Sequence, residues 1–249
     1  MKHRELSVGV WVIVLFAMLF TLTEAAQDNV TAFVERTYQT CLGRPSDAEG
    51  VAFWREQVAT GQKPGAELAE FFFLSEEFVT QENSDDVFVE RLYNTLLNRQ
   101  SDAAGKQEWM RRLNRGCARS GLLRNFIMSD EFSVVCSSFG INKGDVPARE
   151  NRDINLMATV FVYRLYETLL SRQADTDGLN FWTGRIANED WTAIQVAEKF
   201  VFSNEMDSRS PNATTFVTLL YRAFMDREPD MDGIAYWTGL MAAGASKER

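Results

Sequence analysis

One short pattern occurs four times in this chain of 249 residues and limits its fold more than any other feature. In each copy an arginine is followed by an aspartate three residues on, a glycine three residues later and a tryptophan four residues after that. Successive copies are 55, 73 and 55 residues apart, which predicts a tandem array of one structural unit with a single longer insertion. The motif residues are Arg44, Asp47, Gly50 and Trp54; Arg99, Asp102, Gly105 and Trp109; Arg172, Asp175, Gly178 and Trp182; and Arg227, Asp230, Gly233 and Trp237.

Each motif follows a stretch of apolar residues with helical spacing. In the second copy these residues occupy positions i, i+1, i+4, i+5, i+8 and i+9 counted from Phe88. The same pattern starts at Phe33, Phe161 and Phe216. A helix is the only regular structure with this period, so each stretch is predicted to be a helix with one apolar stripe.

The motif itself predicts the start of a second helix. Its aspartate follows a short polar connection and can accept hydrogen bonds from free backbone N–H groups as an N-cap, and the preceding arginine can pair with it. The glycine and the tryptophan are four residues apart and therefore share one helix face. We expect the glycine to permit close approach of a neighbouring helix and the tryptophan to fill the adjacent space.

A third apolar segment completes the first three copies and ends in a serine followed by acidic residues, which is typical of another helix start. These endings begin at Ser75, Ser129 and Ser203. The predicted fold class is therefore all-α, with tandem helical repeats in four copies of a three-to-four-helix unit arranged as two pairs. In the fourth copy the third segment would begin near residue 246, so we expect that repeat to be truncated. A surface left for a partner or a second subunit, a truncated gene model and an atypical terminal cap are the three interpretations.

The first residues predict export. Basic residues precede a 15-residue apolar run, Val8 to Leu22, and small residues follow it at Ala25 and Ala26. This is the pattern of a signal peptide over residues 1–26, because the run is shorter than the roughly 18 to 20 residues of a membrane-spanning helix. An uncleaved anchor is the alternative. The helical pattern lapses between Ser133 and Asn155, which predicts a helical domain over 27–140, a linker over 141–155 and a second helical domain over 156–249.

The full pattern resembles a known bacterial family. Phe-Val-x-x-Leu-Tyr-x-x-Leu-Leu-x-Arg-x-x-Asp-x-x-Gly-x-x-x-Trp with a Ser-x-Glu-Phe ending is similar to the domain of unknown function 4214, which looks like a relative of the phycobilisome linker superfamily. The resemblance implies compact helical modules of secreted and surface proteins, often beside calcium-binding repeats, with no shared enzymatic activity. Phycobilisome linkers bind pigment proteins, but the signal peptide argues against a cytosolic antenna here. The chain departs from the pattern at Cys41, which replaces leucine, and at Glu108, which replaces an aromatic residue.

Charge and composition exclude several classes of function. The net charge of −9 disfavours binding to nucleic acid or to anionic membranes. The only histidine, His3, lies in the predicted signal peptide, so the mature chain would lack Ser-His-Asp and Cys-His catalysis. An enzyme would need a carboxylate pair such as Asp47 with Glu49 or Asp175 with Asp177, yet these groups recur where helix capping already explains them.

Calcium is the only cofactor that the motif raises. Asp175, Asp177, Asp230 and Asp232 resemble the opening of two calcium-binding loops. Such a loop needs a glutamate at its twelfth position, where this chain has Ile186 and Met241. We therefore expect no catalytic, cofactor or metal residues, and calcium stays an alternative.

Two cysteines have no counterpart in the other repeats. Cys117 and Cys136 are 19 residues apart, and a bridge between them would contribute about 3 kcal/mol in the chain-entropy estimate. An exported protein can form such a bond, so we predict a disulfide. Two unrelated buried thiols are the alternative.

The sequence thus predicts a secreted, periplasmic or surface-located helical module for protein interaction or extracellular structure. Its partner would be an unknown protein or surface component, not nucleic acid and not a membrane beyond the signal peptide. Self-association through the truncated fourth repeat is a further alternative. The competing interpretation is a secreted carbohydrate-active enzyme that works through carboxylates.

Overall fold

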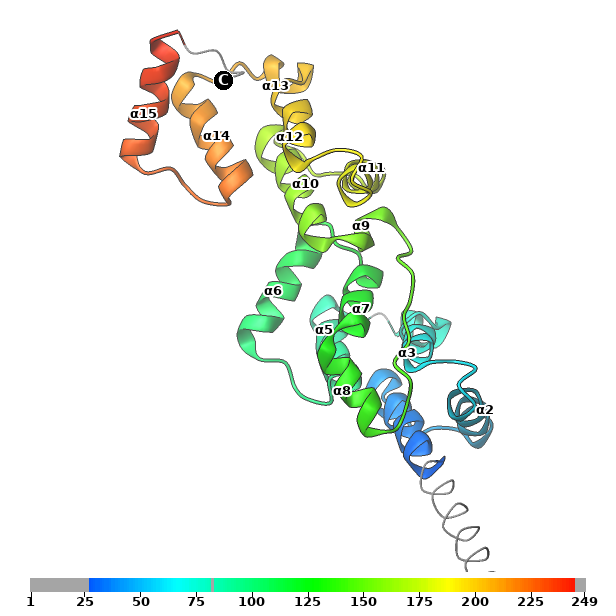
Figure 1. Cartoon of the computed structure of the whole chain (residues 1–249). Helices are drawn as coiled ribbons and strands as arrows, with labels where there is room; N and C mark the ends of the chain where they lie inside the picture. The colour runs from blue at the N-terminus through cyan, green and yellow to red at the C-terminus, as the bar shows by residue number, and fades with distance from the viewer. Residues whose placement is uncertain (1–26, 82, 245–249) are drawn as a thin grey trace, which may run out of the picture. The chain divides into compact units, whose positions relative to one another are not determined.

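The computed structural model describes residues 27–81 and 83–244, which form helices joined by loops (Figure 1). No strand occurs within these two ranges, so the predicted all-α class is confirmed. The predicted signal peptide, residues 1–26, lies outside the described residues. No helix in the described part of the chain has the length and apolar character needed to cross a membrane.

Every repeat begins with a stripe helix and continues with a motif helix that starts just after the motif aspartate. The stripe helices are residues 27–37 continued by the π-helical turn η1 (Tyr38–Leu42), then α5 (Asp85–Leu96), α10 (Leu156–Leu169) and α14 (Ala213–Met225). The motif helices are α2 (Ala48–Ala59), α6 (Ala103–Asn114), α11 (Thr176–Ala187) and α15 (Met231–Ala242).

In the first three repeats two more helices follow, and we call them together the closing segment. The closing segments are α3 (Gly65–Phe73) with α4 (Glu76–Thr80), α7 (Arg119–Met128) with α8 (Asp130–Ser138), and α12 (Ala193–Val201) with α13 (Asn204–Ser208). The second helix of each starts at the predicted serine, because Ser75, Ser129 and Ser203 each accept a hydrogen bond from the backbone N–H three residues on, at 3.1 Å.

The chain divides into two compact units. Of the described residues, unit 1 contains those up to Met110 together with Leu123–Pro147, and unit 2 contains Arg111–Leu122 together with those from Ala148 onward. Helices α6 and α7 therefore contribute residues to both units. The chain passes from unit 1 to unit 2 for the last time between Pro147 and Ala148, within the predicted linker of residues 141–155.

The apolar stripes form the core of each unit, as their spacing predicts. In unit 1 Phe33 and Phe88 are almost fully buried together with Phe73, whose ring meets that of Phe88 edge-on at 5.9 Å. In unit 2 Leu165 and Leu169 lie in a cluster that also contains residues of α11, α12, α13 and α14. Burial of these side chains is the main favourable contribution to folding.

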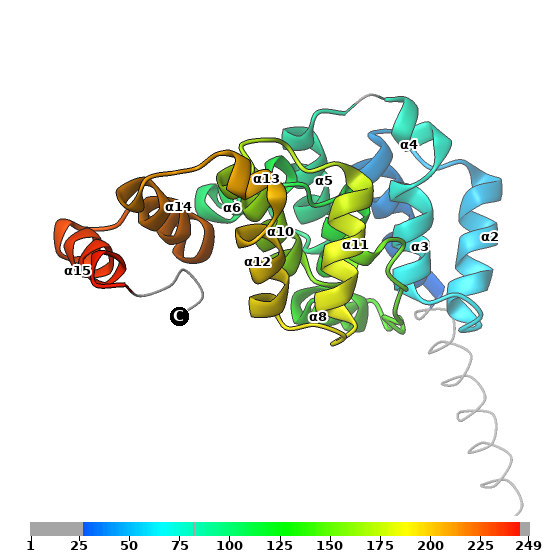
Figure 2. The same cartoon turned by 90° about the horizontal axis from the view of Figure 1, so that it is seen from above.

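Stripe helices pair within each unit through one arginine. Arg36 donates to the backbone carbonyls of Asn94 and Thr95 at 2.8 and 2.5 Å in unit 1. At the equivalent position in unit 2, Arg164 donates to the carbonyl of Ala223 at 2.7 Å. The predicted arrangement as two pairs is thus confirmed. In the second pair α14 contacts both α10 and α15, and Figure 2 shows α15 beside α14.

The segment after α8 is more ordered than its composition indicates. Ile141 and Val146 are buried, and the short helix α9 (Asn151–Ile154) follows. The carbonyls of Asn142 and Lys143 accept hydrogen bonds from Gly65 and Ala66 at 2.9 and 2.8 Å. These bonds satisfy free N–H groups at the start of α3, whose N-cap residue is a proline without a side-chain acceptor.

Candidate functional site

The motif residues of each repeat gather around the hydroxyl group of a tyrosine on the stripe helix. The four tyrosines are Tyr38, Tyr93, Tyr166 and Tyr221. A Cβ atom added at Gly178 or Gly233 would lie 2.5 or 2.6 Å from this hydroxyl oxygen, and one added at Gly50 or Gly105 would lie closer still. The motif glycine is therefore the residue that lets the tyrosine hydroxyl reach the backbone of the motif helix.

The motif aspartate caps the motif helix, as predicted. The N–H of the motif glycine donates to the carboxylate of Asp47, Asp102, Asp175 and Asp230 at 2.7, 2.8, 2.7 and 2.6 Å. In the first three repeats this backbone hydrogen bond is the main cause that lowers the pKa of the aspartate. The carboxylate is ionised and bound to its own helix start.

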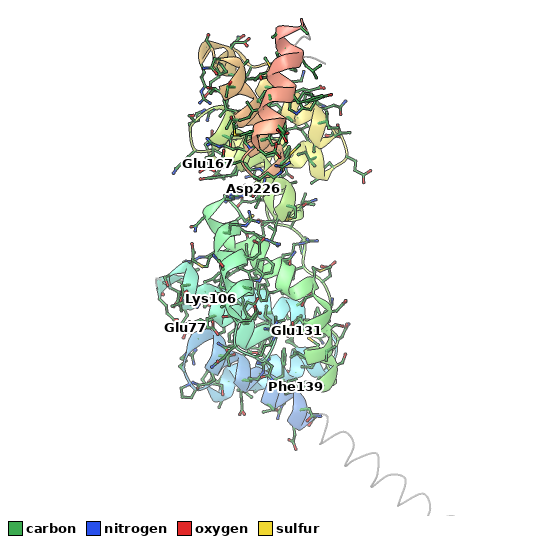
Figure 3. The ribbon with its side chains drawn as sticks, turned by 90° about the vertical axis from the view of Figure 1, so that its left-hand side faces the viewer. Glu77, Lys106, Glu131, Phe139, Glu167 and Asp226 are labelled. Carbon is green, nitrogen blue, oxygen red and sulfur yellow. The ribbon has the colours of Figure 1, made fainter. Side chains whose placement is uncertain are left out.

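The motif arginine has a closer partner than the predicted aspartate. Arg44, Arg99 and Arg172 lie 3.5, 3.7 and 3.9 Å from their aspartates. Each instead donates two hydrogen bonds from its guanidinium to the carboxylate of a glutamate in the closing segment, at 2.5 to 3.3 Å. These glutamates are Glu77, Glu131 and Glu205, and Figure 3 labels the first two.

A phenylalanine of the closing segment covers the tyrosine and the tryptophan together. Phe72 lies 4.7 Å from Tyr38 and 6.0 Å from Trp54, between ring centroids. The equivalent distances are 5.1 and 4.9 Å for Phe126 in the second repeat, and 4.8 and 5.3 Å for Phe200 in the third. Edge-on and tilted ring contacts of this kind stabilise beyond the area that they bury. The closing segment therefore brings one phenylalanine and, five residues later, one glutamate to each motif.

The fourth repeat has the same internal geometry without this cover. Arg227 lies over the ring of Tyr221 at 5.0 Å, close to the 4.7 to 4.9 Å of the other three repeats. Yet Trp237 is 44% exposed, whereas Trp54 is 4% exposed. Phe224 is 40% exposed at a stripe position where Leu169 is fully buried.

We call the residues left uncovered in the fourth repeat the open face. It consists of Tyr221, Phe224, Met225, Arg227 and Trp237 on and between α14 and α15. Within the described ranges Arg227 has no carboxylate partner. Several exposed apolar side chains beside a cation without a carboxylate partner are typical of an interaction site.

An arginine cluster lies beside this face in unit 2. Asp226 accepts hydrogen bonds from Arg115 at 2.7 and 3.1 Å, which lowers the pKa of Asp226, and it lies 3.2 Å from Arg164. A hollow of about 560 Å³ adjoins these residues, and Glu167 and Asp226, labelled in Figure 3, both line it. Because the arginines bind carboxylates and helix carbonyls of the protein, the cluster holds residues 111–122 against the last two repeats.

The calcium candidates are placed at helix starts. Asp175 and Asp230 cap α11 and α15, and Asp177 and Asp232 lie in the first turns of these helices. Among residues 27–81 and 83–244, no group of three or more histidine, cysteine, aspartate or glutamate side chains could hold a metal ion.

The disulfide predicted between Cys117 and Cys136 is not formed in the structure. Both are free and buried, as is Cys41. Cys117 belongs to unit 2, where its thiol lies 3.6 Å from the carbonyl of Leu156, whereas Cys136 belongs to unit 1 and packs against Gly65. Burial raises the pKa of the Cys117 and Cys136 thiols to about 12, so both are protonated and unreactive near neutral pH.

Sequence reasoning missed the role of the tyrosine at each motif and, in the first three repeats, the glutamate and the phenylalanine that contact it. A signal for the glutamate was present, because the motif arginine and this glutamate are 33, 32 and 33 residues apart in the three closed repeats. The phenylalanine was hidden among other apolar residues of the third segment.

Comparison with protein families finds the same fourfold division. The family described as Domain of unknown function (DUF4214) matches residues 18–82, 69–136, 149–210 and 197–249. Adjacent matches overlap at 69–82 and 197–210, which contain α4 and α13. No curated protein and no solved structure matches the chain. The four matches span most of the sequence, and the chain therefore belongs to the DUF4214 family, in four tandem copies.

Proposed function

We propose that the protein is an exported, non-enzymatic helical module that binds another protein or contributes to structure at or beyond the cell envelope. The observation that carries the proposal is the open face, an apolar surface with an unpaired arginine on a repeat whose other copies are closed. Such a surface costs free energy in water unless a partner covers it.

The competing enzyme hypothesis needs two carboxylates facing each other across a cleft, about 5 to 10 Å apart. Here the recurring aspartates are bound to helix starts, and the recurring glutamates are bound to arginines. These engagements account for the whole recurring set without catalysis. Export rests on the sequence of residues 1–26 alone.

Fractionation of cells that produce the untagged chain, followed by mass spectrometry of its N-terminus, tests export. We expect the chain outside the cytoplasm with a start near Gln27. Retention in the cytoplasm would remove that part of the proposal.

A photo-crosslinking amino acid at position 224 tests interaction, with position 181 as the matched control. Phe181 is 51% exposed on the closed third repeat, so it offers a similar aromatic surface without an open face. We expect protein adducts from position 224 and not from 181. Hydrolysis of a polysaccharide by the wild type, lost in Asp175→Asn/Asp177→Asn, would instead support the enzyme.

A further inference from the structure

The three closed repeats define what fits a motif of this kind. Each closing segment contributes a phenylalanine to the tyrosine–tryptophan pair and a glutamate to the arginine. The sequences that do this are Phe72-Phe-Leu-Ser-Glu-Glu-Phe78, Phe126-Ile-Met-Ser-Asp-Glu-Phe132 and Phe200-Val-Phe-Ser-Asn-Glu-Met206. They share Phe-x-x-Ser-x-Glu followed by Phe or Met.

The fourth repeat keeps the glycine, tyrosine, arginine and aspartate geometry found beneath each closing segment. Gly233 lies against the hydroxyl of Tyr221, the guanidinium of Arg227 lies over the same ring, and Asp230 caps α15. These positions match those in the closed repeats, although within residues 27–81 and 83–244 no phenylalanine ring contacts Tyr221 or Trp237 and no glutamate carboxylate binds Arg227. The receptor geometry is therefore set before any closing segment is present, which lowers the entropy cost of binding one.

We propose that the open face is a docking site for a helical segment of another polypeptide with the chemistry Phe-x-x-Ser-x-Glu-Phe/Met. The partner's phenylalanine would pack on Tyr221 and Trp237, and its glutamate would pair with Arg227. Its serine would cap the turn of helix between them, as Ser75, Ser129 and Ser203 do in this chain. This inference rests on the proposed function and specifies the partner's chemistry.

A second copy of the chain fits the face less well. In a two-fold contact the same patch meets itself, so the open face of a second copy would bring another arginine and no glutamate. The closing segments of a second copy are engaged as well, because Phe72, Phe126 and Phe200 are buried in their own repeats.

The probe is a fluorescently labelled peptide of residues 63–81, which is the first closing segment and contains no tryptophan or tyrosine. Titration with the full chain is followed by fluorescence anisotropy, and helix formation by circular dichroism, since a free peptide of this length is a marginal helix. We expect saturable binding with a gain of helix.

Variants on both sides locate the site. Phe72→Ala in the peptide and Trp237→Ala in the chain should each weaken binding by about tenfold or more, as for a central aromatic anchor. Glu77→Gln in the peptide should weaken binding about two- to fivefold with the wild-type chain and not with Arg227→Gln, the pattern of a direct ion pair. Arg172→Gln changes the equivalent of Arg227, and Phe181→Ala removes an exposed aromatic side chain, both in the closed third repeat, and both should leave the affinity unchanged.

Absence of binding to the wild-type chain, or binding that survives Trp237→Ala, overturns the proposal. A wild-type dimer that dissociates in Trp237→Ala without any peptide binding also overturns it and assigns the face to a second copy. If the chain is exported and forms crosslinks from position 224 but does not bind the peptide, only the inferred chemistry of the partner is overturned. The proposed function is therefore tested separately.

Discussion

The third and fourth repeats differ in what covers the motif. Both place the arginine over the tyrosine ring, at 4.7 and 5.0 Å, and both bring the glycine to within about the same distance of the tyrosine hydroxyl. Trp182 packs against the core of unit 2 and meets Phe200, whereas Trp237 is 44% exposed. The comparison separates two roles of the motif: its local geometry needs only two helices, but most of its burial comes from the closing segment.

The largest expected effect on stability comes from replacing each of the two tryptophans, Trp182 and Trp237, with alanine in separate variants. Trp182→Ala should destabilise unit 2 by about 3 kcal/mol because it empties a packed site. Trp237→Ala should cost about 1 kcal/mol or less because much of that side chain already faces water. Both lie in the same unit, so urea unfolding followed by circular dichroism compares them directly. Equal losses would mean that the fourth repeat is closed in solution.

The motif glycines give a test of intermediate size. Gly178→Ala should cost about 1–3 kcal/mol, since its Cβ would lie 2.5 Å from the hydroxyl of the buried Tyr166. Gly233→Ala makes a similar clash, but Tyr221 is only half-buried and can move aside, so a smaller loss is expected. Tyr166→Phe removes the clashing oxygen, and the double variant with Gly178→Ala should recover part of the loss. No recovery would contradict the role given to the hydroxyl.

Hydrogen exchange compares α11 with α15 without any substitution. Both are motif helices of unit 2, but α11 buries Leu179, Thr183 and Gly184 and α15 buries no residue. Amides in α15 should exchange at least about tenfold faster than those in α11, because local opening there exposes little new apolar surface. Mass spectrometry of exchanged peptides measures the ratio, and similar protection in the two helices would contradict the comparison.

Local patterns predicted most of the fold. The apolar spacing of the stripes located four helices, and the motif aspartates and the serines located the starts of others, because a cap is decided within three residues. The partner of the motif arginine could not be found in this way. Asp47 is only three residues from Arg44 in sequence, but the carboxylate of Glu77, on a separate helix, lies closer to the Arg44 guanidinium. Only the fold brings that glutamate near.

The cysteines illustrate the same limit. Their spacing and absence from other repeats favoured a disulfide, yet spacing along the chain carries no information on which unit each residue joins. Helix α7 passes from unit 2 to unit 1, so Cys117 and Cys136, before and after that passage, pack in different cores. The sequence allowed both a disulfide and two separate buried thiols, and it contained no information that distinguishes between them.

The smallest expected effect concerns the ion pair that the fourth repeat lacks. The hydrogen bond from Arg44 lowers the pKa of Glu77, so the pair stabilises the fold above the unfolded-state value of about 4.3. This stability is lost as the pH falls through the lower folded-state pKa. Glu77→Gln should therefore cost about 0.2–1 kcal/mol at pH 7, since both partners are partly exposed, and less at pH 2. Arg227→Gln removes only the contact with the Tyr221 ring and should have the same small effect at both pH values, because Arg227 has no carboxylate partner among the described residues. Urea unfolding at both pH values measures the four differences, and a loss in Arg227→Gln equal to that in Glu77→Gln would show that the fourth arginine is already paired.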